Sequence, residues 1–154
     1  MKKLPEKLLV LLVSVLVLST FIATHYSSKY LYWEIKQVGS SKVDVYLKGF
    51  LADKVVGADL NVFFDKNNLQ VVSAGAGEFF GDPIIIRTDD RNLSYSLMAN
   101  PEGKIESDRS KPLFKFHLLP AKLSGYKFCV LPSSQVYLSK IGGSFPKALC
   151  QNLR

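Results

Sequence analysis

The two histidines of this chain are the first residues to consider for acid–base or metal chemistry. His25 follows an uncharged apolar run, and His117 stands between Phe116 and Leu118 in an alternating segment that is typical of a strand. Neither histidine has a second ligating residue at a spacing that metal sites use. We therefore expect ordinary solvated or capping histidines and no metal site.

Three aspartates offer the oxygen ligands that calcium prefers, namely Asp82, Asp89 and Asp90. Their spacing does not match a helix–loop–helix calcium site. Asp and Asn side chains also favour turns, because they hydrogen-bond to the local backbone. Residues 89–92 are therefore predicted to form a turn between two strands, not a cation site.

The sequence lacks the patterns of the common catalytic sites. It contains no Ser-His-Asp order, no Gly-rich phosphate loop and no Cys-x-x-Cys pair. Two carboxylates could still meet in the folded chain, which leaves a glycosidase as the one enzymatic alternative. We expect a protein that is not an enzyme and needs no cofactor.

Cys129 and Cys150 are the only two cysteines. In an exported chain, two cysteines most simply form one disulfide. This bond would tie the C-terminal segment to the strand predicted at 127–131. The alternative is a pair of buried free thiols, which is expected if the host exports reduced proteins.

The charge of the chain is moderately basic, with 20 Lys and Arg against 13 Asp and Glu, a net charge of +7. From His25 onward the excess is smaller, at 17 basic against 12 acidic residues, and the basic residues are scattered. Nucleic-acid binding would predict a basic stripe with interleaved aromatic residues. We expect no nucleic-acid partner, and a surface compatible with anionic lipid or wall polymer.

The N-terminal region is predicted to be a membrane anchor. The run Leu8 to Ala23 contains no charge, and Lys2, Lys3 and Lys7 precede it. This charge bias places the N-terminus in the cytoplasm and the rest of the chain outside. No good cleavage site follows the run, which favours an uncleaved anchor over residues 1–24 and leaves a cleaved signal, and hence secretion, as the alternative. Residues 25–29 form a short linker.

After residue 30 the chain alternates between apolar and polar residues, with turn residues between the alternating segments. No helical period follows Ala23. Eight or nine strands separated by such turns predict an all-β sandwich over residues 30–141. Residues 142–154 are predicted to be a C-terminal tail.

The strand predicted from Val55 to Phe64 organises the rest, with a turn at 65–68 and a second strand from Leu69 behind it. Its inward row is apolar, and its outward row is mixed. The inward residues are Ala58, Leu60, Val62 and Phe64, and the outward residues are Asp59, Asn61 and Phe63. The outward row is a solvated face in the simplest interpretation. In the functional interpretation it is a binding face, because hydrogen-bond acceptors beside an apolar anchor suit a protein partner.

The same stretch resembles cohesin domains. The matching segments are Gly57-Ala58-Asp59, the strand Leu60 to Phe64 with Asp65, Leu69-Gln70-Val71-Val72, and Gly77-Glu78-Phe79-Phe80. The resemblance covers residues 30–139 within the wider group of cohesin-like and carbohydrate-binding β-sandwich modules. It implies a cohesin-like jelly roll of about nine strands. One departure is Lys66, which replaces the usual proline after the turn aspartate.

In cohesins the dockerin docks on the sheet that contains this strand, and Asp59 matches an acidic residue of that contact. The resemblance therefore implies a non-catalytic module at the cell surface that binds a dockerin-type or other exported protein. One alternative is a polysaccharide-binding module, since related sandwiches serve polysaccharide-degrading systems. Another is a structural ectodomain of an envelope complex. In each case we expect a single-pass protein of the cell membrane with its C-terminal domain outside, or else a secreted protein.

Overall fold

The computed structural model describes residue 14 and residues 31–64, 69–89, 92–100, 107–119, 124–139 and 142–154, apart from the side chains of Asp53 and Ile86. The predicted linker 25–29 and turn 65–68 lie outside these residues, as does the membrane segment Leu8–Ala23 apart from its Ser14. In the part of the chain that is described, no helix is long and apolar enough to cross a bilayer.

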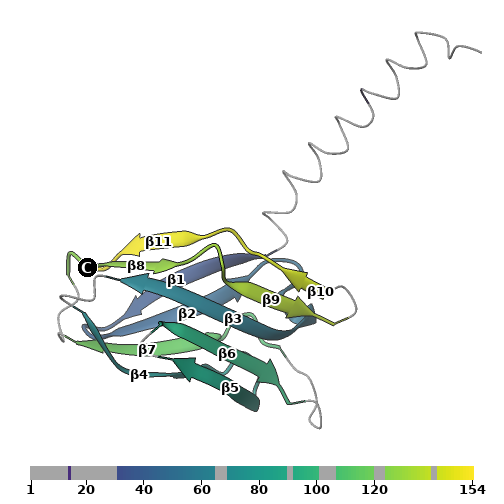
Figure 1. The fold of residues 1–154 in the computed structure, drawn as a ribbon, viewed down its shortest axis with the longest axis horizontal. Helices are drawn as coiled ribbons and strands as arrows, with labels where there is room; N and C mark the ends of the chain where they lie inside the picture. Colours follow the sequence, from purple (N-terminus) through teal and green to yellow (C-terminus); the bar gives the residue numbers. More distant parts are fainter. Residues whose placement is uncertain are drawn as a thin grey trace, which may run out of the picture.

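The described residues form an all-β sandwich of two sheets (Figure 1). Its strands are β1 (Tyr32–Val38), β2 (Lys42–Lys48), β3 (Val55–Phe64), β4 (Gln70–Ala76), β5 (Pro83–Asp89), β6 (Ser94–Ala99), β7 (Phe114–Leu119), β8 (Lys127–Val130), β9 (Gln135–Leu138), β10 (Gly142–Ser144) and β11 (Leu149–Asn152). A short 3-10 helix, η1 (Ala52–Lys54), precedes β3. The four-stranded sheet has the order β1-β2-β7-β4. The larger sheet has the order β10-β9-β3-β6-β5, and β8, paired with β3 and β11, extends it.

The predicted all-β sandwich is confirmed, and the described residues form eleven strands where about nine were expected. Residues 142–154, predicted to be a tail, supply β10 and β11, which pair with β9 and β8. These strands are three and four residues long. Segments of this length are too short to show an alternating pattern, and their pairing with neighbours is what makes them strands.

Consecutive strands do not always pair in this fold. β1 and β2 form a hairpin through Gly39, whose φ of +71° suits the tight turn. In contrast, β3 and β4 lie in opposite sheets and do not pair with each other, because β3 pairs with β6, β8 and β9 while β4 pairs with β7. β3 and β4 therefore follow each other in the chain without forming a hairpin.

The core lies between the two sheets and is rich in aromatic side chains. The predicted inward row of β3 is confirmed, since Ala58, Leu60, Val62 and Phe64 are all buried. The Tyr95 ring of β6 packs edge-on against the Phe116 ring of β7 at 5.0 Å between centroids. Edge-to-face contacts of this kind add to the free energy gained from apolar burial. They join the inner faces of the two sheets.

Replacing Leu60 by Ala tests the inward row. Leu60 is fully buried in the middle of the larger sheet. Truncation leaves a cavity there, so we expect the free energy of unfolding to fall by about 2–5 kcal/mol. The matched control is Leu119→Ala on the exposed end of β7, which should change stability by less than about 0.5 kcal/mol. Equal effects of the two variants in urea unfolding would contradict this assignment of the core.

Candidate partner-binding face

The centre of the candidate site is β3. It pairs with one strand along one of its edges and with two strands along the other. Along the first edge β3 pairs with β6 from Gly57 to Asn61. Along the second edge it pairs with β9 as far as Asp59, and then with β8 from Val62 onward. Asn61 lies between the part of β3 that pairs with β9 and the part that pairs with β8.

Buried Ser134, in the loop from β8 to β9, fills this break in the ladder. The Ser134 Oγ accepts a hydrogen bond from the Asn61 backbone N–H at 3.0 Å and donates to the Asn61 carbonyl at 3.1 Å. The Asn61 side-chain amide donates to the Ser133 carbonyl at 3.2 Å. The backbone N–H and carbonyl of Asn61 and its side-chain NH2 are therefore engaged within the fold, so fewer of its polar groups are available to a partner than the sequence suggested.

The outward face of the larger sheet carries one apolar row that crosses four strands. Ile84 on β5 lies opposite Met98 on β6, Met98 lies opposite Gly57 on β3, and Gly57 lies opposite Tyr137 on β9. Phe63 lies farther along β3 on the same face. Ile84, Met98, Tyr137 and Phe63 are each 37–53% exposed. The face therefore presents a row of partly exposed apolar side chains, with Phe63 farther along β3.

Gly57 has no side chain, which leaves room for the Tyr137 ring beside it in this row. A Cβ atom at Gly57 would stand 3.2 Å from the Leu97 carbonyl oxygen and 3.4 Å from Cδ2 of Tyr137. The Tyr137 ring therefore packs closely beside the glycine. Its hydroxyl donates a hydrogen bond to the Asp59 carboxylate, and this bond raises the pKa of Tyr137. Asp59 thus fixes the orientation of Tyr137 while leaving a carboxylate on the face.

Phe63 lies beside the single disulfide. It stands opposite Cys129 in the β3–β8 pair, and Cys129 stands opposite Cys150 in the β8–β11 pair. The two Sγ atoms are 2.09 Å apart. The disulfide therefore links the strand next to β3 with the C-terminal strand, at the edge of the candidate face.

Asp89 organises the turn from β5 to β6. Its carboxylate accepts hydrogen bonds from the Asn92 backbone at 3.0 Å, the Asn92 amide at 2.9 Å and the Arg87 guanidinium at 3.0 Å. These donors, the Asn92 backbone first, lower the pKa of Asp89 to about 2. Asp89 and Asn92 are joined by these bonds at the two ends of the predicted turn, and Asp90 and Arg91 lie outside the described residues. No cluster of three potential metal ligands occurs among the described residues.

The remaining predicted residues lie elsewhere. His117 is half-buried on the outward face of the four-stranded sheet, between Lys42 and Ser73. It therefore lies in the other sheet from β3. His25 lies outside the described residues. Met98 also belongs to the candidate face, next to Ile84 on one side and, across Gly57, near Tyr137 on the other. That adjacency depends on strand order, for which one sequence carries no local signal.

Known proteins were compared with the chain by sequence and by fold. No protein-family model matches it, and no curated protein sequence matches it. Solved cohesin modules match its fold. The cohesin module from a family 33 glycoside hydrolase of Clostridium perfringens has a TM-score of 0.60 at 17% identity, covering 82% of this chain and 96% of that chain. The sixth cohesin of scaffoldin B from Acetivibrio cellulolyticus has a TM-score of 0.56 at 19% identity, covering 81% and 99%.

An archaeal cohesin also matches the fold. The non-cellulosomal cohesin of the archaeon Archaeoglobus fulgidus has a TM-score of 0.54 at 18% identity, covering 74% of this chain and 82% of that chain. The protein is therefore a β-sandwich with the fold of a cohesin module. The cohesin-like fold implied by the sequence resemblance is confirmed.

The disulfide can be tested by its effect on stability. It closes a loop with a sequence separation of 21 residues, and the chain-entropy model gives such a link about 3 kcal/mol. We expect the double variant Cys129→Ser with Cys150→Ser to lose roughly this much free energy of unfolding in urea. Intact mass after alkylation without reductant should show two unmodified cysteines in exported protein. Two alkylated cysteines would refute the bond.

Proposed function

We propose that the domain is a non-catalytic recognition module that binds a dockerin-type protein through the outward face of the sheet containing β3. The cohesin fold supports this proposal. Among the similar structures, the Acetivibrio cellulolyticus cohesin was solved in complex with a Cel5 dockerin, and a Clostridium thermocellum cohesin, matched at a TM-score of 0.56 and 16% identity, in complex with the dockerin Doc918.

The observation that carries the proposal is the composition of the outward face. Ile84 and Met98, which lie opposite each other, and Phe63 farther along β3 are exposed apolar side chains of the kind that anchors protein–protein complexes. The Asp59 carboxylate lies between them and is already held by Tyr137. Asn61 belongs to the proposed surface, although its amide is engaged with the Ser133 carbonyl. A partner that fits would bring apolar side chains to the row and a lysine, arginine or amide to Asp59.

Alanine substitutions on this face test the proposal. We expect Met98→Ala and Phe63→Ala each to weaken the complex by more than about 1 kcal/mol while leaving the fold intact, because each removes an exposed anchor. Asp59→Ala should weaken binding similarly and also release the Tyr137 hydroxyl. The measurement is calorimetric titration with dockerin modules encoded by the source organism, paired with a thermal melt of each variant.

The control is Leu119→Ala, which removes a side chain about as exposed as Met98 from the opposite sheet. It should leave binding unchanged. Two results would contradict the proposal: no dockerin binds, or the face variants and the control weaken binding equally. Retention of the protein in a polysaccharide affinity gel, lost in the Phe63 variant, would instead support a glycan-binding module.

We further propose that the domain is held at the outer side of the cell membrane by the segment Leu8–Ala23. The support is in the sequence, where three lysines precede an uncharged run of sixteen residues without a good cleavage site. Secretion after cleavage is the alternative. An exterior location would also suit a module whose two cysteines form a disulfide.

Fractionation of the cells tests this location. The full-length protein should stay with membranes after a carbonate wash, and its C-terminal domain should be open to protease added outside the cell. The physical reason is that an uncleaved apolar run keeps the chain in the bilayer. A soluble mature protein that starts near Ser27 would show that the run is a cleaved signal.

A further inference from the structure

One end of the sandwich carries exposed aromatic side chains beside the start of β1. Tyr32 pairs with Lys48, the last residue of β2, and bridges to Lys147. Phe50 follows Lys48 by two residues and Phe145 precedes Lys147 by two, so both belong to this end, where β10 lies in Figure 1. With 74% and 64% of their areas exposed, Phe50 and Phe145 are the most exposed large apolar residues of the described chain.

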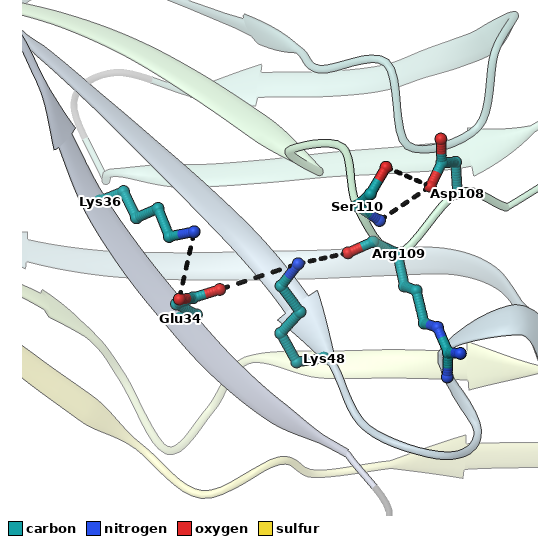
Figure 2. Close-up of polar contacts among 6 residues, drawn as sticks. All are labelled: Glu34, Lys36, Lys48, Asp108, Arg109 and Ser110. Carbon is teal, nitrogen blue, oxygen red and sulfur yellow. Dashed lines mark hydrogen bonds and ion pairs between the residues drawn. The ribbon is translucent and has the colours of Figure 1, made fainter.

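Basic side chains accompany these rings. The Lys48 ammonium lies 3.8 Å from the Glu34 carboxylate and donates to the Arg109 carbonyl, which ties the loop before β7 to this end (Figure 2). The Arg109 side chain extends away from Asp108 in the same view. The Asp108 carboxylate accepts hydrogen bonds from Ser110, and those bonds lower its pKa.

Basic side chains gather on the part of this end where β1 begins. Among the side chains that the structure describes, four basic residues face two acidic ones: Lys48, Lys54, Arg109 and Lys147 against Glu34 and Asp108. Glu78 and Asp82 follow β4 at the same end of the sandwich, because the Asp108 backbone N–H donates to the Phe79 carbonyl at 2.7 Å, but β4 and β1 are the opposite edge strands of their sheet. The excess of basic residues is therefore found only on the part of this end next to Tyr32, which pairs with Lys48 and bridges to Lys147.

This end is also where the chain enters the domain. Seven residues, 24–30, separate Ala23 from Leu31. A fully extended chain of this length spans at most about 25 Å. β3 alone has ten residues, about 33 Å. A bilayer that holds the run Leu8–Ala23 would therefore lie next to this end and not next to the far one.

We propose that this end, which we name the basal end (Tyr32, Lys48, Phe50, Lys54, Arg109, Phe145 and Lys147), rests on an anionic lipid bilayer. Phe50 and Phe145 enter the headgroup layer, where aromatic rings are stabilised by partial burial. The lysines and the arginine lie against anionic headgroups, which attract basic residues within a Debye length of the surface. The strands then stand away from the bilayer, and the outward face of β3 stays open to a partner. The inference needs the proposed membrane location but not the proposed dockerin partner.

Tryptophan placed at the basal end would report contact with lipid. The full-length Phe50→Trp variant is reconstituted into vesicles of equal parts phosphatidylcholine and phosphatidylglycerol, with brominated lipid as quencher. The wild-type chain, whose only tryptophan is buried Trp33, gives the background. The matched control is Phe63→Trp, an exposed phenylalanine on the outward face of β3. We expect Trp at 50 to be quenched at least about twofold more strongly than Trp at 63, because a ring in the interface lies within the headgroup layer.

A charge reversal tests the role of anionic lipid. Lys147→Glu combined with Arg109→Glu, in the Phe50→Trp background, should remove most of the extra quenching, and so should vesicles of phosphatidylcholine alone. Lys42→Glu combined with Lys127→Glu, at the opposite end, should have no effect.

Three results would overturn the inference. Equal quenching at positions 50 and 63 would mean that the basal end does not touch lipid. A concentration-dependent blue shift of Trp at 50 without lipid quenching would mean that a second copy of the chain covers it. A chain that does not associate with vesicles would overturn the inference together with the membrane location, and would leave the partner-binding proposal standing.

Discussion

The rest of the structure depends on how the backbone of β3 finds hydrogen-bond partners. β3 is ten residues long, and along one of its edges no single strand covers this length. β9 pairs with its first half and β8 with its last three residues. The gap falls at Asn61, where backbone groups without partners would cost free energy in a half-buried position. The Ser134 hydroxyl acts as donor and acceptor there, and it is the one fully buried polar side chain of the described core.

This arrangement also shapes the outward face. Because β8 and β9 share one edge of β3, the loop between them comes beside Asn61 and occupies the middle of the face. The apolar side chains are then left on either side of that point, with Tyr137 and Met98 near the start of β3 and Phe63 near its end. The face is polar at its centre and apolar at its two ends, with Asp59 between them.

The C-terminal segment closes the sandwich at the edge where β1 lies. β11 pairs with β8, and the disulfide joins the same two strands. The side-chain amide of Gln37 pairs with the backbone of Arg154 as another strand would. Its Nε2 donates to the Arg154 carbonyl at 2.6 Å, and its Oε1 accepts from the Arg154 N–H at 2.6 Å. These contacts hold the last residue against β1, so residues that look like a tail in the sequence complete the domain.

The sequence by itself determined the fold class, the hairpin of β1 and β2, and the two faces of β3. Each of these follows from local chemistry, since alternation fixes which side chains point inward and glycine permits the tight turn. Only the tertiary structure decided that β3 and β4 lie in opposite sheets and that residues 142–154 form strands. It also decided that Ile84, Met98 and Tyr137 share a row with Gly57. The physical reason is that strand order and register depend on packing and hydrogen bonds between segments far apart in the chain, and a period of two is the same whichever neighbour a strand takes.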